Sequence, residues 1–403
     1  MKYVPLDLPE SGATVVVGLS GGVDSTLTAL LLKRRGCNVI GVTMSLWDGH
    51  IPIVQAEKPF HDACYSPNEK EDIDACRKFC AETGIEYHVI DVSVEYNRQV
   101  LDYVTKEYRS GKTPNPCIRC NSFIKFGALL EGLKKLEIDY DYFCTGHYAM
   151  VVRPEEGLWG TDKKPAMIAC ALDDLKDQTY FLYRLDSNLL EKVRFPLAFM
   201  KKSEVFKLAK EAGLEAAEKK ESQDFVDDCY FDALFSDRET VPGNFVNADG
   251  VILGKHKGLQ YYTIGQRRGL GISSAKPLYV KKIDAKKNEI VLAEKNDILA
   301  SVLYAEDFVW AGNVVPDTVV EAWGKIRLRS KGALCQVEKV KTEEKSDNGA
   351  TQDIENKKNE KWKISFFEKQ NAITPGQSVV LYKDNVIIGG GIISEVIDEW
   401  IKT

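Results

Sequence analysis

A strand, a glycine turn and a helix follow one another near the start of the chain, and this order constrains the fold more than any other feature. Residues 14–18 (TVVVG) form a β-branched run typical of a buried parallel strand. The turn at residues 20–22 comes next, and the apolar residues between 27 and 32 predict a helix that ends near Gly36. This arrangement presents backbone N–H groups at the positive end of a helix, which favours phosphate binding.

The side chains of the turn indicate the kind of ligand. Gly21 and Gly22 let the backbone approach an anion closely, and the hydroxyls of Ser20 and Ser25 can donate to its oxygens. Asp24 cannot donate when ionised, so we expect it to serve a metal ion on the phosphates. A Walker loop would need Gly-Lys-Ser/Thr at its end. SGGVDS instead resembles the PP-loop of enzymes that adenylate a substrate with ATP; the alternative is a glycine turn with no ligand.

The first half of the chain repeats this alternation. Further strands are predicted at residues 39–44, 86–92 and 142–145, a helix at 71–83, and another helix from about 202 to 213. Such alternation predicts right-handed βαβ units and a doubly wound parallel sheet, an α/β fold. Ligands of these sheets bind beyond the carboxyl ends of the strands. Ser20, Met44 and Gly146 are all expected there.

The second half of the chain has a different sequence pattern. Short β-type runs occur after about residue 249, at positions 261–264, 278–280, 289–292, 379–382 and 386–389. They predict a small β-barrel. A chain of 403 residues is expected to form two or three domains. We place these domains at residues 1–215, 216–297 and 298–403, with a flexible charged insertion at 341–361.

Composition excludes some classes of protein and leaves others open. No apolar run approaches the roughly 18 residues that span a bilayer, and the first residues lack the apolar core of a secretion signal. The ten cysteines are therefore expected to be reduced, in a cytoplasmic protein without membrane contact. A net charge of −6 argues against indiscriminate binding of nucleic acid. This net charge is still compatible with a local basic surface. The alternative is that each basic pair is simply an ordinary solvated face.

Two sets of residues are candidates for such a surface. Basic candidates include Lys201, Lys202, Lys325, Arg327, Arg329 and Lys331. Aromatic candidates for stacking or contact are Tyr261, Tyr262, Trp310 and Trp323, for which packing in the core is the alternative.

The segment TPNPCIRCN at residues 113–121 is the second informative motif. Its prolines predict an extended backbone, and Cys117 and Cys120 would lie on one side of a turn. Arg119, and a helix beginning near Asn121, would favour thiolates. A zinc knuckle needs a second ligand pair, which the sequence lacks, and a thioredoxin-like pair would sit in a different βαβ pattern. A sulfur-handling or iron–sulfur site needs a more distant third cysteine, which is available.

Five segments in the same order make the resemblance to one family close. They are SGGVDS, TPNPCIRCN, CTGHYA, LKDQTYFLY and GLQYYTIGQRRGLGIS. Together they resemble the tRNA-specific 2-thiouridylases, which modify the wobble uridine, over nearly all of the chain outside residues 50–62 and 341–361. The resemblance implies a PP-loop domain like that of the adenine nucleotide alpha hydrolases, a small central domain and a C-terminal β-barrel.

The resemblance also assigns residues. It implies that ATP, with Mg²⁺, is bound by Gly18, Leu19, Ser20, Gly21, Gly22, Val23, Asp24, Ser25, Met44 and Gly146. It implies contacts with tRNA, the target base included, at Asn115, Pro116, Cys117, Lys176, Asp177, Gln178, Arg327 and Leu328. Cys120 matches the catalytic nucleophile of the family. His147 follows Gly146 and is either functional or a positioning hydrogen-bonding group.

The chain departs from the family pattern at two cysteines. Cys117 stands where the family has an aspartate, and Cys229 lies three residues beyond the position of the second family cysteine. Cys229 is either a second catalytic cysteine that carries a persulfide, resolved by a disulfide with Cys120, or an ordinary thiol. Alternatively, Cys117, Cys120 and Cys229 hold a 4Fe–4S cluster with one iron open to sulfide.

The expected function is ATP-dependent 2-thiolation of uridine 34 of tRNA, through adenylation of its C2 oxygen. The sulfur would come from a cysteine persulfide or from cluster-bound sulfide. Expected partners are the anticodon stem-loop and either a donor protein, such as a cysteine desulfurase or sulfur relay protein, or free sulfide. The alternatives are a PP-loop tRNA thiolase acting at another position, an amidating adenylating synthetase, and a non-catalytic RNA- or metabolite-binding protein.

Overall fold

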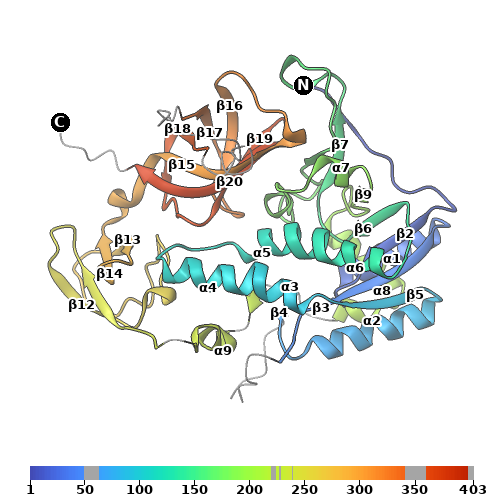
Figure 1. The fold of residues 1–403 in the computed structure, drawn as a ribbon, viewed down its shortest axis with the longest axis horizontal. Helices are drawn as coiled ribbons and strands as arrows, with labels where there is room; N and C mark the ends of the chain where they lie inside the picture. Colours follow the sequence, from blue (N-terminus) through green and yellow to red (C-terminus); the bar gives the residue numbers. More distant parts are fainter. Residues whose placement is uncertain (50–62, 219–223, 227, 238, 341–359, 398–403) are drawn as a thin grey trace, which may run out of the picture. The chain divides into compact units, whose positions relative to one another are not determined.

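A five-stranded parallel sheet forms the centre of the first of two units into which the chain divides (Figure 1). The computed structural model describes residues 1–49, 63–218, 224–226, 228–237, 239–340 and 360–397. The first unit comprises Met1–Asp102, Pro116–Ser236 and Asp384–Ile387. The second comprises Tyr103–Asn115, Asp237–Lys383 and Ile388–Thr403.

The parallel sheet has the strand order β5-β3-β2-β6-β9. The bounds are β2 Thr14–Gly18, β3 Asn38–Ser45, β5 Glu86–Asp91, β6 Tyr142–Thr145 and β9 Val193–Arg194. All neighbouring pairs are parallel, which confirms the predicted α/β sheet. The chain runs outward from β2 to β5 and then crosses to β6, so the order reverses between β2 and β6. Such a switch point is where sheets of this kind bind ligands.

Helices cover this sheet and bury its apolar side chains. The long ones are α1 Val23–Arg34, α2 Glu69–Thr83 and α8 Lys202–Glu211. The α2 helix ends at Gly84 in the left-handed conformation, as its sequence predicts. One cluster packs Val15 and Val17 of β2 against α1 and α2, and another packs Leu27 of α1 against α8. These contacts hold the start of α1 at the end of β2.

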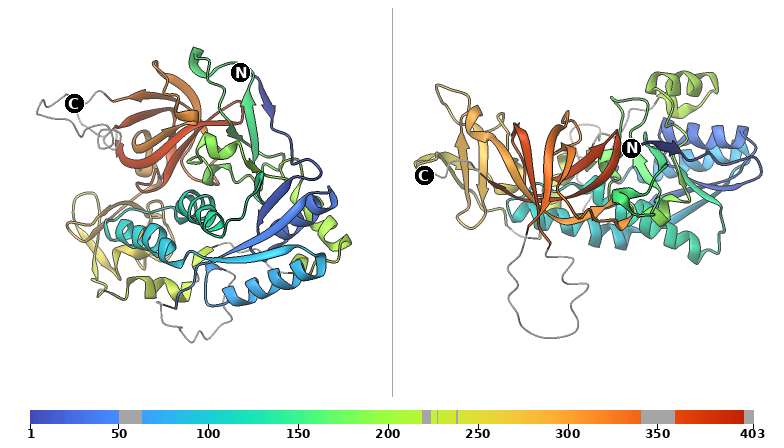
Figure 2. Two further views of the ribbon diagram at one scale, coloured as in Figure 1. Left: turned by 45° about the vertical axis from the view of Figure 1, so that its right-hand side comes forward. Right: turned by 90° about the horizontal axis from the view of Figure 1, so that it is seen from above.

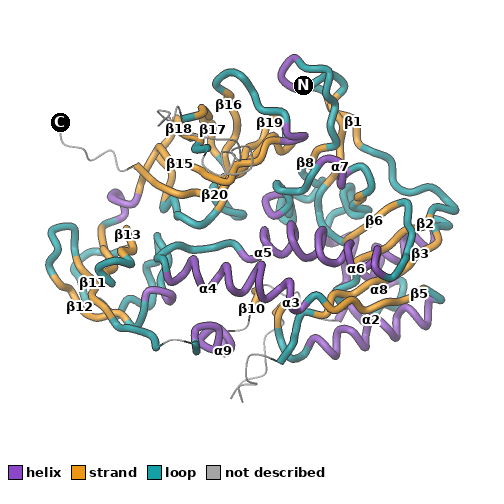
Figure 3. Tube along the Cα trace, in the orientation of Figure 1, coloured by secondary structure: helices purple, strands orange, loops and turns teal. Residues whose placement is uncertain are grey.

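The remaining elements of the first unit are short. Helical segments are α3 Ser93–Tyr96, η1 Asn97–Leu101, α5 Pro116–Arg119, η2 Cys120–Ala128, α6 Leu129–Lys135, η3 Leu158–Gly160, η4 Thr179–Phe181, α7 Ser187–Leu190, η5 Glu215–Glu218, α9 Asp228–Phe231 and η6 Asp232–Phe235. Strands β1 Tyr3–Pro5, β7 Met150–Pro154 and β8 Met167–Ala169 pair antiparallel, whereas β4 Ala63–Tyr65 and β10 Asp224–Val226 pair parallel. Helix α4, Asp102–Arg109, leads into the second unit. Figure 3 distinguishes these helices and strands by colour.

A four-stranded sheet forms the first part of the second unit, in the order β12-β11-β14-β13. Its strands are β11 Gly243–Val246, β12 Ile252–His256, β13 Tyr279–Asp284 and β14 Glu289–Ala293. The strand predicted at 261–264 is wrong: the 3₁₀ turn η7, Leu259–Tyr261, lies there, and Tyr262 is buried against Phe245. The positive φ angles of Gly258 and Gly265 on either side turn the chain out of an extended path.

Six antiparallel strands close into a barrel in the second part of this unit, which confirms the predicted β-barrel. They are β15 Leu299–Trp310, β16 Val320–Lys325, β17 Ala333–Lys339, β18 Trp362–Asn371, β19 Ser378–Lys383 and β20 Val386–Ile397, preceded or joined by η8 Lys295–Ile298 and η9 Ala311–Asn313. Figure 2 shows these strands from two further directions. Closure leaves no free strand edge. Of the predicted flexible insertion 341–361, residues 341–359 lie outside the described residues.

No helix among the described segments combines the length and the apolar character needed to cross a membrane.

Candidate active site

The turn between β2 and α1 is folded back onto the first turn of the helix. The Ser20 backbone N–H donates to Ser25 Oγ at 3.1 Å, and Ser25 Oγ donates to the Gly22 carbonyl at 3.0 Å. Thr26 Oγ1 donates to the same carbonyl at 2.9 Å. Gly21 has a φ of +75°, a conformation that favours glycine. The loop predicted to bind phosphate is therefore shaped by its own hydrogen bonds.

Gly146 packs directly against this loop. It follows β6, whose Thr145 pairs with Gly18 of β2 at the switch point. A Cβ atom at position 146 would lie 2.7 Å from the carbonyl carbon of Asp24 and 2.8 Å from the backbone nitrogen of Ser25. These are backbone atoms, so only a glycine fits. Met44, the remaining predicted nucleotide contact, lies in β3 one residue before its end.

Replacing Gly146 by alanine is therefore expected to push the loop out of place. Overpacking of this kind costs about 2 kcal/mol of unfolding free energy, which lowers the Tm by about 4–8 °C. ATP affinity should fall at least about tenfold, since the backbone must seat the phosphates. Gly22→Ala is the matched control for stability, because its Cβ would have 3.6 Å to the nearest atom. Calorimetry measures both quantities; an unchanged Tm for Gly146→Ala would contradict the clash.

Asp24 is held by two side chains that the sequence did not connect with it. Lys202 Nζ donates to both carboxylate oxygens, at 2.8 and 2.7 Å, and the Tyr148 hydroxyl donates to Oδ1 at 2.9 Å. The sequence offers Lys202, with Lys201, as a candidate for a basic surface, but its side chain is only 9% exposed. That interpretation is wrong for Lys202, because the start of α8 points it at the loop. A buried ammonium group thus lies beside the predicted phosphate site.

A second carboxylate lies next to the same loop. Asp72 of α2 is so close to Gly21 that a Cβ atom there would be 2.9 Å from Asp72 Oδ1. Sequence analysis did not select Asp72, since it sits within a run of acidic residues in an ordinary amphipathic helix. Asp24 and Asp72 together give the loop two carboxylates of the type that ligate Mg²⁺.

Cys117 and Cys120 lie on a helix, which corrects one prediction. The helix begins at Pro116, where α5 continues into the π-helical segment η2, and not near Asn121. Proline suits this first position because its missing N–H would be unpaired there in any case. Residues three apart share a helix face, so both thiols lie on one side of it. The Arg119 guanidinium instead donates to the Gln99 carbonyl and to Gln99 Oε1, each at 3.0 Å.

The ionisation of Cys120 also differs from the prediction. Burial raises the pKa of the Cys120 thiol to about 11, with a smaller contribution from Cys64, while Lys125 opposes the shift. The expectation that Cys120 is a thiolate is therefore wrong, because burial outweighs the positive charge that lowers this pKa, that of Lys125. Burial, and then Lys125, also lower the pKa of His147 well below its usual value. Its imidazole is neutral and its Nδ1 lies 2.7 Å from Thr145 Oγ1.

Alkylation of Cys120 is therefore expected to be slow at neutral pH and to keep accelerating up to pH 10. The reason is that only the thiolate reacts, and a pKa of about 11 leaves little thiolate below that pH. Mass spectrometry of the Cys120 peptide after pulses of iodoacetamide gives the rate at each pH. Lys125→Met should slow alkylation further, because it removes the neighbouring positive charge. A rate that levels off below pH 8.5 would show a thiolate instead.

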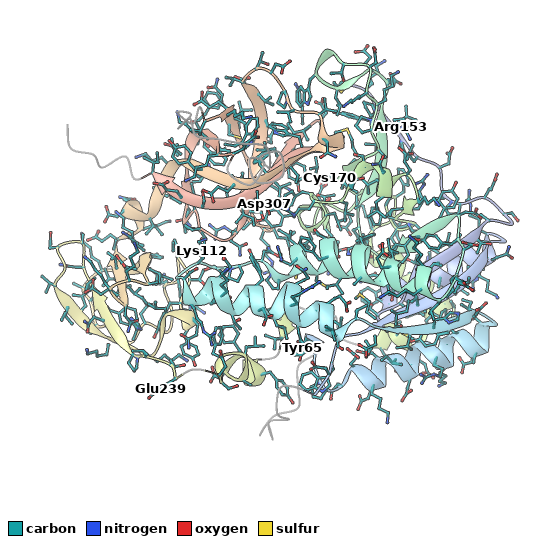
Figure 4. The ribbon with its side chains drawn as sticks, viewed as in Figure 1. Tyr65, Lys112, Arg153, Cys170, Glu239 and Asp307 are labelled. Atoms are coloured by element: carbon teal, nitrogen blue, oxygen red, sulfur yellow. The ribbon has the colours of Figure 1, made fainter. Side chains whose placement is uncertain are left out.

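A third described thiol lies near this helix. Cys64 of β4 is exposed. Burial, with smaller contributions from Cys120, Cys64 and Cys117, raises the pKa of Tyr96 well above its usual value. The next residue along β4, Tyr65, is labelled in Figure 4 and stacks on Tyr96 with ring centroids 5.4 Å apart. Sequence analysis missed Cys64 because nothing around it forms a motif.

The predicted tRNA contacts are distributed over both units. Asn115 belongs to the second unit, where its amide donates to Gln377 Oε1 at 3.5 Å and Gln377 in turn donates to the carbonyls of Thr113 and Pro114. In the first unit, Asp177 accepts from Thr179 Oγ1 at 2.6 Å and Gln178 accepts from the Tyr148 backbone at 2.9 Å.

The remaining predicted tRNA contacts lie in three places. Pro116 and Cys117 open α5, and Lys176 precedes Asp177 in the first unit. In the barrel, Arg327 donates to the Asn371 carbonyl and Leu328 is half-buried.

The cysteine set predicted for a cluster is described only in part. Cys229 belongs to α9, but its side chain lies outside the described residues. Among the side chains that are described, no group of three or more His, Cys, Asp or Glu is arranged to hold a metal ion.

Comparison with known proteins places the whole chain in one family. Residues 13–231, 232–294 and 339–393 match the domains described as tRNA methyl transferase HUP domain, tRNA methyl transferase PRC-barrel domain and aminomethyltransferase beta-barrel domain. The tRNA-specific 2-thiouridylase of Endomicrobium trichonymphae is 40% identical over 388 residues, 95% of this chain and 99% of that protein. Those of Carboxydothermus hydrogenoformans and Clostridium botulinum strain Hall are each 39% identical, over 94% of this chain and 97% and 99% of theirs. The chain therefore belongs to the family of the tRNA-specific 2-thiouridylases.

Proposed function

We propose that this protein uses ATP to replace the C2 oxygen of the wobble uridine, position 34 of tRNA, by sulfur. One observation carries the proposal: the phosphate loop and Cys120 belong to the same unit and are linked by neighbouring side chains. Phe126 belongs to η2, the helical segment that Cys120 opens, and its ring lies beside that of His147 with centroids 6.0 Å apart. His147 follows Gly146 in the chain, and Gly146 packs on Asp24 and Ser25. A nucleotide and a thiol can therefore serve one substrate atom.

Activation of the base is the first step. The C2 oxygen of uracil is a poor leaving group, so we infer that it attacks the α-phosphorus of ATP and releases pyrophosphate. The loop from Gly18 to Ser25, with Met44 and Gly146, would hold the nucleotide, and Lys202 would balance charge on the phosphates. Magnesium would neutralise phosphate charge when bound, and the carboxylates of Asp24 and Asp72 fit such an ion.

Recognition of the base falls to the residues around the cysteine helix. Asn115, Pro116 and Cys117 are proposed to contact the target uridine. The stretch Lys176, Asp177 and Gln178, and in the barrel Arg327 and Leu328, are proposed to contact the rest of the anticodon stem-loop. A wobble base is unpaired and can be splayed into a pocket without opening a duplex.

Sulfur transfer is the second step, and we infer that Cys120 and Cys229 share it. The terminal sulfur of a Cys229 persulfide would bond to C2 as AMP leaves with the oxygen. The Cys120 sulfur then attacks Cys229 Sγ, which forms a disulfide, loses its proton to solvent and frees the thiolated base. A cysteine desulfurase or a sulfur relay protein would pass persulfide sulfur to Cys229 after a thiol reduces the disulfide. Free sulfide would instead attack the disulfide at Cys229 Sγ, which leaves a Cys229 persulfide and the Cys120 thiol.

A cluster is the second candidate for this step, because Cys117 gives the helix a second thiol at the position where the family resemblance implies an aspartate. Cys117, Cys120 and Cys229 would be its ligands, and the cluster would supply an open iron for sulfide. Anaerobic purification with absorption and Mössbauer spectroscopy decides between the two. Full activity in iron-free protein would leave the persulfide route.

The function is tested with purified protein, ATP, Mg²⁺, sulfide and an unmodified tRNA transcript. Pyrophosphate release should depend on the tRNA, and nucleoside mass spectrometry should find 2-thiouridine at position 34. An amidating synthetase would release pyrophosphate without tRNA. A thiolase that acts at another position of the tRNA would place the sulfur in a different nucleoside. A binding protein would do neither. Because the reaction needs ATP, tRNA and reduced thiols, we place it in the cytoplasm.

A further inference from the structure

Three large apolar side chains form a row across the outer face of the barrel. Trp323 of β16, Leu334 of β17 and Phe367 of β18 are 54%, 39% and 57% exposed. Trp323 pairs directly with Leu334 on the neighbouring strand. Cys335 pairs with Phe366, so in the same register Leu334 lies opposite Phe367. Adjacent strands lie about 4.8 Å apart, so the three side chains are neighbours. We call these three residues, of which Trp323 and Phe367 are aromatic, the aromatic row.

The aromatic row differs from the rest of the outer face. The residues next to it along the strands, Ala322, Cys335 and Phe366, point into the barrel and are buried. Other outward positions on the same strands carry polar side chains, namely Glu321, Gln336, Lys363 and Ser365. Single exposed apolar residues are ordinary on protein surfaces, but a contiguous apolar strip marks an interaction site.

Positive charge gathers at one side of the row. The turn between β16 and β17 starts after Lys325 and carries Arg327, Arg329 and Lys331, all three exposed. No acidic residue occurs from Ala322 to Val337. Lys325 Nζ lies 4.8 Å above the ring of Tyr382, the residue that pairs with Trp323 on its other side.

Two acidic side chains of this face, Glu321 and Glu338, lie on the other side of the row and are bonded to neighbours. Glu321 Oε1 accepts from Gln336 Nε2 at 3.4 Å, and Glu338 Oε1 accepts from Lys363 Nζ at 2.9 Å. On the side of the basic turn, Glu368 follows Phe367 and is itself followed by the exposed Lys369. The face therefore offers aromatic and apolar surface bordered by cations, which suits a polyanion with exposed rings.

We propose that the aromatic row stacks against unpaired nucleobases of the RNA substrate, while the cations of residues 325–331 hold the adjoining phosphates. Base–aromatic stacking beside a basic groove is how proteins bind single-stranded nucleic acid. A purely apolar protein partner would have no use for the flanking cations. The proposal rests on the proposed function, since it takes tRNA as the ligand. The sequence leaves Trp323 between stacking and core packing. Burial removes Trp310 and Tyr262 from the stacking candidates, whereas Trp323 is exposed and Tyr261, in the other part of the unit, is half-buried.

The test compares full-length variants in binding an unmodified tRNA transcript. Trp323→Ala should raise the Kd about tenfold, the scale of one lost stacked base. Trp323→Phe keeps a ring and should restore most of the affinity. Val319→Ala, which alters a side chain that is 54% exposed just before β16, is the matched control and should bind like the parent. The Tm should stay unchanged, because the Trp323 side chain is exposed.

Salt dependence separates stacking from charge. Trp323→Ala should leave the slope of log Kd against log salt unchanged, since stacking releases no counterions, whereas Arg329→Ala should reduce it by about one. If the parent binds and thiolates tRNA, and Trp323→Ala binds it equally tightly, this inference is overturned while the proposed function stands. Sedimentation showing that the substitution breaks a dimer without weakening RNA binding would overturn it in the same way. A parent that binds no tRNA would overturn the proposed function as well.

Discussion

Cys120→Ser is expected to stop thiolation while tRNA-dependent release of pyrophosphate continues for one turnover. The reason is that, in the proposed mechanism, the loop and Lys202 would activate the base without using the thiol, whereas every proposed route for sulfur needs Cys120. Loss of a covalent group of this kind reduces turnover by about a thousandfold or more. The measurement is a single-turnover reaction followed by nucleoside mass spectrometry and, in parallel, by a pyrophosphate assay.

The control for Cys120→Ser is Cys170→Ser. Cys170, labelled in Figure 4, is a half-buried cysteine after β8 that the proposed chemistry does not use. It should thiolate at nearly the parent rate. If Cys120→Ser also kept that rate, the assignment of the nucleophile would be wrong. If it lost the pyrophosphate burst as well, Cys120 would act in binding or folding of the base pocket.

The second large effect is expected at the pair of Asp24 and Lys202. Asp24→Asn removes the carboxylate that accepts two hydrogen bonds from the buried Lys202 ammonium, and breaking such an ion pair costs about 3 kcal/mol. The Tm should fall by about 6–12 °C, and ATP turnover should be lost because the loop changes shape. Differential scanning calorimetry and the pyrophosphate assay give the two readouts.

The double variant separates the pair from its surroundings. Combining Asp24→Asn with Lys202→Met removes both charges and should recover part of the Tm, because no buried ion is then left unpaired. Lys207→Met, on the same helix, is the matched control: Lys207 is 75% exposed, its partner Glu211 lies 3.9 Å away, and the change should cost under about 0.5 kcal/mol. Equal Tm values for Asp24→Asn and the parent would mean that the pair contributes nothing to stability.

Much of the fold was predictable because its signals are local. The β-branched run before Ser20, the Gly84 stop of α2 and the alternation of strands and helices all depend on residues a few positions apart. The strand expected at 261–264 failed for the opposite reason. Its β-type composition is local, but burial of Tyr262 against Phe245 and the glycines on either side decide its conformation.

The cysteine motif likewise has one property that local spacing sets and another that the tertiary structure sets. The spacing of Cys117 and Cys120 predicted that both residues share one side, and a separation of three residues gives them one face of the helix on which they lie. Their ionisation was predicted wrongly, since it depends on how deeply Cys120 is buried and on Lys125 and Cys64. Desolvation is a property of the packed structure, and no neighbour in the sequence reports it.

By itself, the sequence determined the strand–turn–helix that can seat a phosphate, the parallel sheet around it, the later barrel and the paired thiols, because each arises from contacts within one or two elements. Only the tertiary structure decided what surrounds them. Lys202 reaches Asp24 across 178 residues, and Gly146 packs on the same loop from another strand. Trp323, Leu334 and Phe367 meet only when three strands pair in one register. Such contacts follow from chain crossings, which local patterns do not encode.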